Sequence, residues 1–417
     1  MSHYRKIALG CTAALSLGVA NVAVAQDVEF MTWTFAEASG EPLIQGMIDS
    51  FAGGTVEPQG YAWGEMTTNA LLRARTNTLP DVMQVQARLL PTVANIEQMV
   101  DLNTVFDRAM LEQMFAPGFL AFGEVDGRQM ALPWIGGTIG MVANENVLSA
   151  AGITDLPTTV EEFRADLIAI RDAVPNSVPY GMATTNANSI VLDYMIWVWT
   201  HGGDLVVDGV PAVNSPEAIA GLQFMVDLVA ERLSAPEIDR PDARRLFGQE
   251  AMGFYFDSPQ AAQFAVEFSG NADYAQFVEP MMTPVLAEGD DPVSIQWGHV
   301  ITLLNSENAD ATSAAAQFML HLLSDDQLIP YTAANGTIPS TVSGQADASF
   351  QSDAYRAAWA ANSGVPRRNA IASLSNGAEI ATIIGEEVQA AILGQKTAEE
   401  AANDMQARMV EAFANAG

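Results

Sequence analysis

The first third of the chain alternates short apolar runs with amphipathic stretches. Residues 28–33 and 82–85 are mainly apolar with polar interruptions, which predicts two β-strands. Residues 42–51 and 65–75 repeat apolar side chains at the spacing of one helical turn, which predicts two helices. Strands and helices that alternate at these lengths are typical of an α/β protein with parallel sheets.

Helical patterns dominate the rest of the chain. Residues 158–162, Thr-Thr-Val-Glu-Glu, have the form of a capping box and predict a helix start. Apolar residues keep a helical stripe over 219–233 and over 313–323. Residues 385–414 are predicted to be helical with a break near Gly394. We find no internal repeat and no low-complexity tract.

The N-terminus has the pattern of an export signal. Two basic residues, Arg5 and Lys6, precede the mostly apolar residues 7–22, and an Ala-Val-Ala cleavage motif ends at Ala25. We therefore expect residues 1–25 to be a cleaved signal peptide and the mature protein to be periplasmic. No later run is long and apolar enough to predict a membrane span.

Composition and charge narrow the function classes. The chain has 417 residues, of which 49% are hydrophobic, so it can bury a large core, and global disorder is excluded. Fifty acidic and 18 basic residues give a net charge of −32, which argues against binding to nucleic acid or to anionic membranes. The scarcity of lysine is consistent either with a saline habitat or with compositional drift.

The single cysteine, Cys11, lies in the predicted leader. The mature chain would then contain no disulfide, no thiol nucleophile and no cysteine-based metal site.

Catalytic signatures are missing from the sequence. It contains no G-x-S-x-G nucleophile elbow, no H-E-x-x-H motif and no P-loop. The histidines outside the leader, His201, His299 and His321, are widely spaced, and we interpret them as ordinary surface or capping residues. The many carboxylates leave open a pair suited to glycoside hydrolysis. The prediction is a protein that is not an enzyme and has no cofactor and no metal.

Several weak motifs occur in a characteristic order along the chain. They occupy residues 63–66, 79–82, 126–134, 142–148, 156–163, 202–205, 214–218, 249–253, 315–318 and 336–340. In this order the chain resembles the extracellular solute-binding proteins of carbohydrate ABC importers, the maltose-binding-like group. It departs from that group at Ala143-Asn144, where members often carry a Tyr-Asn pair.

The resemblance implies an α/β, two-lobe type II periplasmic-binding-protein fold with a hinge and an interlobe ligand cleft. The chain would cross between the lobes near residues 134–136, 294–297 and 338–340. The N-terminal lobe would comprise residues 26–135 plus 296–338, and the C-terminal lobe residues 136–295 plus 339–417.

Aromatic and polar side chains gather where this fold would place its cleft. Aromatic rings cover the apolar faces of sugars, and carboxylate, amide and guanidinium groups satisfy the hydroxyls. The alternatives are core packing for Trp33 and Trp197, a solvent-facing position for Asp193, a solvated loop for Gln86 and Arg88, a helix-dipole contact for Glu65 and an N-cap for Asp257. The predicted ligand-binding residues are Trp33, Glu37, Trp63, Glu65, Gln86, Arg88, Trp134, Asp193, Trp197, Asp257, Trp297 and Arg367.

The resemblance implies a periplasmic substrate-binding subunit that captures a small sugar or glycoside. Its expected partners are this carbohydrate ligand and the transmembrane subunits of an ABC permease, and we expect a monomer. The alternatives are a receptor for a polyol, a sugar phosphate or a glycosylated osmolyte, and a secreted carbohydrate-active enzyme. Arg367 bears on this choice because an arginine in the cleft could bind an acidic ligand.

Overall fold

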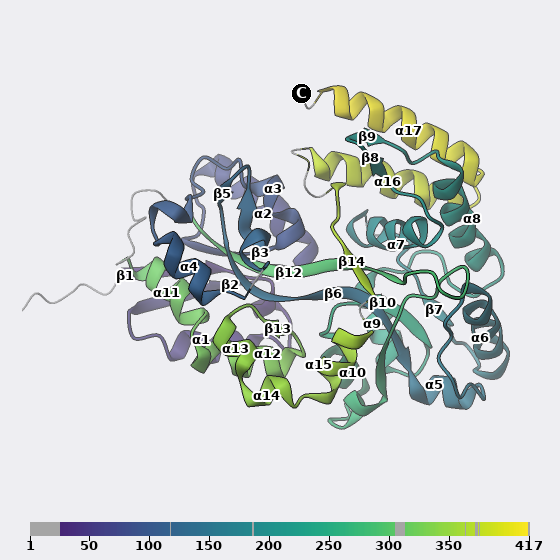
Figure 1. Cartoon of the computed structure of the whole chain (residues 1–417), viewed down its shortest axis with the longest axis horizontal. Coiled ribbons are helices and arrows are strands. Elements are labelled where there is room, and N and C mark those ends of the chain that lie inside the picture. The colour runs from purple at the N-terminus through teal and green to yellow at the C-terminus, as the bar shows by residue number, and fades with distance from the viewer. Residues whose placement is uncertain are drawn as a thin grey trace, which may run out of the picture.

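The computed structural model describes residues 26–116, 118–185, 187–304, 313–362, 364–371, 374 and 376–415. These residues form two lobes joined by long strands (Figure 1). The predicted signal peptide and Cys11 lie outside the described residues. Within the described ranges, no helix has the length and apolar character that a membrane crossing requires.

The first lobe is built on three parallel strands. β1 (Gln26–Met31) lies between β2 (Gly54–Gln59) and β3 (Val82–Gln86). The helices α1 (Glu41–Asp49) and α2 (Met66–Thr76) connect these strands, so the strand–helix alternation predicted for this region is confirmed. Short 3-10 turns follow the strand ends, among them the turn Ala87–Leu89 directly after β3.

Two long antiparallel strands carry the sheet from the first lobe into the second. β6 (Leu132–Asn144) pairs with β12 (Val293–Leu303), which in turn pairs with β3 of the first lobe. The register between β6 and β12 shifts between His299 and Val300. The short strand β13 (Ile338–Pro339) also pairs with β6, so the three predicted crossings lie side by side.

The far end of β6 starts the sheet of the second lobe. There it pairs with β10 (Phe254–Asp257) and β11 (Val278–Met281), and β10 pairs with β7 (Tyr180–Gly181). β14 (Val365–Arg367) lies beside the first residues of β12. Two small hairpins complete the strands, β4 (Glu124–Val125) with β5 (Arg128–Gln129) and β8 (Val206–Val207) with β9 (Val210–Pro211).

Helices cover both lobes (Figure 1). On the first lobe they are α3 (Leu90–Val93), α4 (Arg108–Met114), α11 (Ala314–Leu322), α12 (Asp325–Asn335), α13 (Val342–Ala346) and α14 (Ala348–Gln351). On the second they are α5 (Glu145–Ala150), α6 (Val160–Ala173), α7 (Ala187–Thr200), α8 (Pro216–Ala230), α9 (Arg240–Gly248), α10 (Ala261–Ser269) and α15 (Ala354–Ala361). The predicted capping box is present at α6, where Thr159 and Glu162 cap each other's backbone.

The last two helices form an antiparallel pair on α7 and α8. α16 (Gly377–Ile392) and α17 (Ala398–Asn415) are separated by a turn in which Gly394 has a φ of +69°, a conformation that suits glycine. The predicted break near this residue is therefore confirmed.

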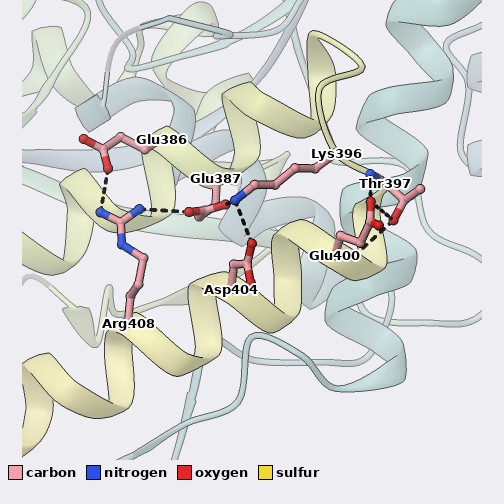
Figure 2. Close-up of polar contacts among 7 residues, drawn as sticks. All are labelled: Glu386, Glu387, Lys396, Thr397, Glu400, Asp404 and Arg408. Carbon is pink, nitrogen blue, oxygen red and sulfur yellow. Dashed lines mark hydrogen bonds and ion pairs between the residues drawn. The ribbon is translucent and has the colours of Figure 1, made fainter.

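Ion pairs between two cations and three carboxylates stabilise this helix pair (Figure 2). Lys396 lies 2.5 Å from a carboxylate oxygen of Glu387 and 2.8 Å from one of Asp404. Arg408 lies 2.6 Å from Glu386 and 2.9 Å from Glu387. We refer to these five side chains as the C-terminal ion network; each of its cations binds two carboxylates.

Candidate ligand-binding cleft

A cavity of about 40 Å³ lies between the lobes, where the crossing strand β12 passes from one to the other. The first lobe contributes residues from the ends of β1 and β3 and from the turn before α2. The second contributes residues from α7, α9 and the loop after β10. The lining side chains are Trp33, Glu37, Trp63, Gln86, Arg88, Ile139, Ser189, Leu192, Arg240, Arg244, Asp257, Ser258, Gln260, Trp297 and His299.

Two tryptophans and a histidine form one wall of this cavity. The ring of His299 lies 4.5 Å from that of Trp33 and 4.4 Å from that of Trp297, edge-on to both. Both indoles are largely buried, whereas Trp63 at the other side is half-buried. The wall offers flat apolar surface of the kind that covers the C–H face of a sugar ring.

Hydrogen bonds fix the tautomer of His299. The hydroxyls of Thr32 and Thr34 both donate to Oε1 of Gln84, so the amide nitrogen of Gln84 faces Nδ1 of His299 at 3.0 Å and donates to it. Burial lowers the pKa of His299 well below its ordinary value, and the charge of Arg88 lowers it further, so the ring is neutral. A neutral ring that accepts at Nδ1 carries its proton on Nε2, which has no partner among the described residues.

Two buried ion pairs hold the arginines of α9 at the opposite wall. Arg240 lies 2.6 Å from Asp193, and Arg244 binds both carboxylate oxygens of Asp257, at 2.7 and 2.8 Å. Burial raises the pKa of Asp193 although Arg240 partly offsets it. Burial also acts to raise the pKa of Asp257, but Arg244 outweighs it and holds that pKa below its ordinary value. Arg240 and Arg244 are therefore neutralised inside the second lobe.

Glu37 stands in the same cavity without an ion pair among the described residues. Burial raises its pKa to about 7, the charge of Arg244 lowers it in part, and the carboxylates Glu267 and Asp257 raise it further. Glu37 is therefore partly protonated near neutral pH and can donate a hydrogen bond as well as accept one.

Arg88 borders three cavities at once. Besides the cavity described above, it lines one of about 100 Å³ that extends toward Trp297, Arg368 and Glu124, and one of about 230 Å³ between α2 and α16. Its Nε atom is buried without a hydrogen-bond acceptor in the described chain, and the same is true of Oε1 of Gln86. Burial, together with the charge of Arg240, lowers the pKa of Arg88 to about 10.

Seven of the twelve predicted residues line the central cavity. They are Trp33, Glu37, Trp63, Gln86, Arg88, Asp257 and Trp297. An eighth, Asp193, is fully buried and lies behind the wall, where it positions Arg240. The fold thus brings these eight residues close to one another. Their contact with a ligand stays a prediction.

The structure places the other four elsewhere. Trp134 is buried in the first lobe and stacks on Tyr331, with ring centroids 4.7 Å apart. Trp197 is buried in the second lobe, where its indole nitrogen donates to the hydroxyl of Tyr180. Glu65 is exposed at the surface. The core alternative thus describes Trp197, and Trp134 is buried in the core as well.

Arg367 also faces away from the cavities. Its guanidinium lies 2.6 Å from Asp204 and 4.5 Å from the ring centroid of Trp199. Its neighbour Arg368 lines the 100 Å³ cavity instead. The structure thus places Arg367 outside the three cavities and its neighbour Arg368 beside one of them.

Sequence reasoning missed His299 and two of the three arginines of α9, Arg240 and Arg244. The interpretation of the histidines holds for His201 and His321, which bond backbone carbonyls, but is wrong for the buried His299. Arg240 and Arg244 are one helical turn apart on α9, a spacing that places both on one face. Within the described ranges, no three His, Cys, Asp or Glu side chains are arranged to hold a metal ion.

Comparisons of sequence give a family. The family described as bacterial extracellular solute-binding proteins matches residues 48–358. A curated binding protein of Brucella abortus (strain 2308) and one of Brucella suis biovar 1 are each 24% identical over 229 residues, 54% of this chain and 54% of theirs. The chain thus spans about half the length of the curated relatives it matches.

Comparisons of structure agree with the two-lobe fold. The GacH receptor of Streptomyces glaucescens, studied unliganded and with acarbose, superposes with a TM-score of 0.82 at 16% identity, covering 94% of this chain and 100% of that one. Maltose-bound MalE3 of T. maritima gives 0.79 at 21% identity, covering 92% and 98%. A Thermotoga lettingae solute-binding protein bound with α-D-tagatose gives 0.81 at 18%, covering 93% and 100%.

Proposed function

We propose that this chain, which belongs to the bacterial extracellular solute-binding protein family, captures a small saccharide between its lobes and delivers it to the permease of an ABC importer. The family is non-catalytic. The mature protein would act in the periplasm, after removal of residues 1–25, and closure of the lobes would report the loaded state.

The observation that carries this proposal is the composition of the cleft. Trp33, Trp63 and Trp297 supply aromatic surface, while Gln86 and Arg88 supply buried hydrogen-bonding groups that no described residue satisfies. A buried polar group without a partner costs about 1–3 kcal/mol, so these groups favour a ligand that bonds them. Saccharides present both apolar faces and hydroxyls.

The structural neighbours support the same class of ligand. They were studied with acarbose, maltose and α-D-tagatose, which are all saccharides or saccharide analogues. At identities of 16–21% these neighbours support the fold, and the cleft residues of this chain support the ligand class.

The test is calorimetric titration of the purified protein with maltose, cello-oligosaccharides and acidic oligosaccharides. Trp297→Ala is expected to weaken binding by about 2 kcal/mol, roughly 30-fold, because stacking surface is lost. Trp199→Ala is the matched control, since Trp199 packs under Arg367 outside the cavities, and its affinity should equal that of the wild type.

Two outcomes would overturn the proposal. One is hydrolysis of a glycoside that is lost when a single cleft carboxylate is changed. The other is a protein that binds no saccharide and whose scattering profile stays the same with every saccharide offered.

A further inference from the structure

The cations of this acidic protein are mostly paired with carboxylates. Of the sixteen arginine and lysine side chains in the described ranges, eleven form an ion pair. Four of the other five, Arg75, Arg128, Arg232 and Arg368, are exposed to solvent. Arg88 alone among these sixteen is partly buried and lacks an ion pair, and its Nε atom is buried without a hydrogen-bond acceptor.

The position of Arg88 indicates where an anion could bind it. The residue lies in the 3-10 turn Ala87–Leu89 that follows β3, and its side chain borders the three interlobe cavities. A guanidinium withdrawn from water is unfavourable unless an anion binds it, and carboxylate and phosphate groups fit its planar donors.

A second cation without a carboxylate borders the same space. Arg368 lines the 100 Å³ cavity together with Arg88, and Trp297 contributes an aromatic surface beside them. The carboxylate of that cavity, Glu124, is 2.9 Å from Arg108 and is thus already bound.

Cleft carboxylates do not neutralise Arg88. Asp193 and Asp257 are held by Arg240 and Arg244. Glu37 forms no ion pair with it in the described structure, and of the arginines it interacts chiefly with Arg244. The proton of His299 on Nε2 adds a further donor to those of Arg88 in the same cavity.

We propose that the captured saccharide is anionic and that Arg88 binds its carboxylate or phosphate, with Arg368 closing on the same group from the rim. This inference rests on the proposed function and names its substrate class. The neutral part of the ligand would lie against Trp297, and the anion would occupy the boundary between the two smaller cavities.

The experiment compares an anionic with a neutral ligand pool by native mass spectrometry and calorimetry. The anionic pool contains uronic-acid oligosaccharides from pectin and alginate together with hexose phosphates. The neutral pool contains malto- and cello-oligosaccharides. We expect capture from the anionic pool, and loss of that capture after phosphatase treatment would identify the phosphate rather than the carboxylate as the recognised group.

Variants then assign the recognition to Arg88. Arg88→Gln should weaken binding of the captured anion at least 30-fold and Arg368→Gln about 5-fold. Arg75→Gln is the matched control, because Arg75 is exposed on α2 and borders none of the three cavities. Its affinity should equal that of the wild type.

A measurement without ligand tests the same idea. Since Arg88 is an uncompensated charge in the free protein, Arg88→Gln should raise the unfolding temperature by a few degrees, while Arg75→Gln leaves it unchanged. A lower unfolding temperature for Arg88→Gln would mean that Arg88 stabilises the fold, and the inference would be wrong.

The outcomes separate this inference from the proposed function. Binding of neutral saccharides alone, with equal affinity in Arg88→Gln, would overturn the anionic class and leave the saccharide receptor intact. Binding from neither pool would overturn both.

Discussion

The C-terminal ion network and the interlobe cleft hold their cations in opposite ways. Between α16 and α17, Lys396 and Arg408 each bind two carboxylates. In the cleft, Arg240 and Arg244 each bind one carboxylate, and Arg88 binds none.

This contrast distinguishes cations that stabilise the fold from a cation that is available to bind a ligand. With 50 acidic and 18 basic residues, carboxylates are abundant, and eleven of the sixteen described cations are paired with one or two. The unpaired cations other than Arg88 are exposed to solvent, so a partly buried arginine without a carboxylate departs from this pattern, and such departures concentrate at functional sites. The comparison therefore predicts different responses when a charge is removed from each region.

The largest effect is expected where a paired, buried carboxylate is removed. Asp193→Ala leaves Arg240 without its partner in a fully buried position and should lower the free energy of unfolding by about 3–5 kcal/mol. Urea denaturation monitored by circular dichroism measures this. Glu386→Ala in the C-terminal ion network is the control, and because that pair is exposed it should cost less than about 1 kcal/mol. Equal costs would remove the distinction between the two regions.

A smaller effect is expected from the unpaired acid of the cleft, and it depends on pH. The pKa of Glu37 is raised by burial from 4.5 to about 7, so the folded protein holds this proton more tightly than the unfolded chain. Its stabilising contribution is complete below pH about 4.5 and is lost as the pH rises to about 7. Glu37→Gln should therefore match the wild type closely at pH 4.5 and be more stable by about 3 kcal/mol at pH 8.

The control for this pH dependence is Glu57→Gln, since Glu57 is exposed on β2. Its unfolding free energy should follow that of the wild type from pH 4.5 to pH 8. A parallel curve for Glu37→Gln would mean that Glu37 titrates like a surface carboxylate.

The smallest effect is expected at Arg367, which is paired and half exposed. Arg367→Gln breaks its contacts with Asp204 and Trp199 and should cost less than about 1 kcal/mol of stability. Saccharide affinity should stay the same, in contrast to Arg368→Gln. If Arg367→Gln weakened binding more than Arg368→Gln, then Arg367 and not Arg368 would be the arginine that contacts the ligand.

Local features of this fold were predictable from the sequence, because nearby residues decide them. The capping box of Thr159 and Glu162 needs only four residues, and the turn at Gly394 needs only one that tolerates a positive φ. The order of motifs along the chain predicted the two-lobe fold, and the structural neighbours confirm it.

The cleft was only partly predictable, because tertiary packing decides which face of an element looks inward. Trp33 and Trp134 both belong to the first lobe, yet one lines the cavity and the other stacks on Tyr331 in the core. His299 was interpreted as an ordinary residue because its partner, Gln84, is 215 positions away and reaches it only across the pairing of β3 with β12. No pattern within either strand encodes that contact.

The register shift between β12 and β6 has a consequence for how the lobes can move. A strand bends most easily where its ladder is interrupted, and the interruption lies beside His299, a residue that faces the cavity. If the lobes rotate about this point, side chains beside it would move little, and Arg240 and Arg244 of α9 would move with the second lobe. The imidazole of His299 would thus keep its position while the arginines of the second lobe move toward it.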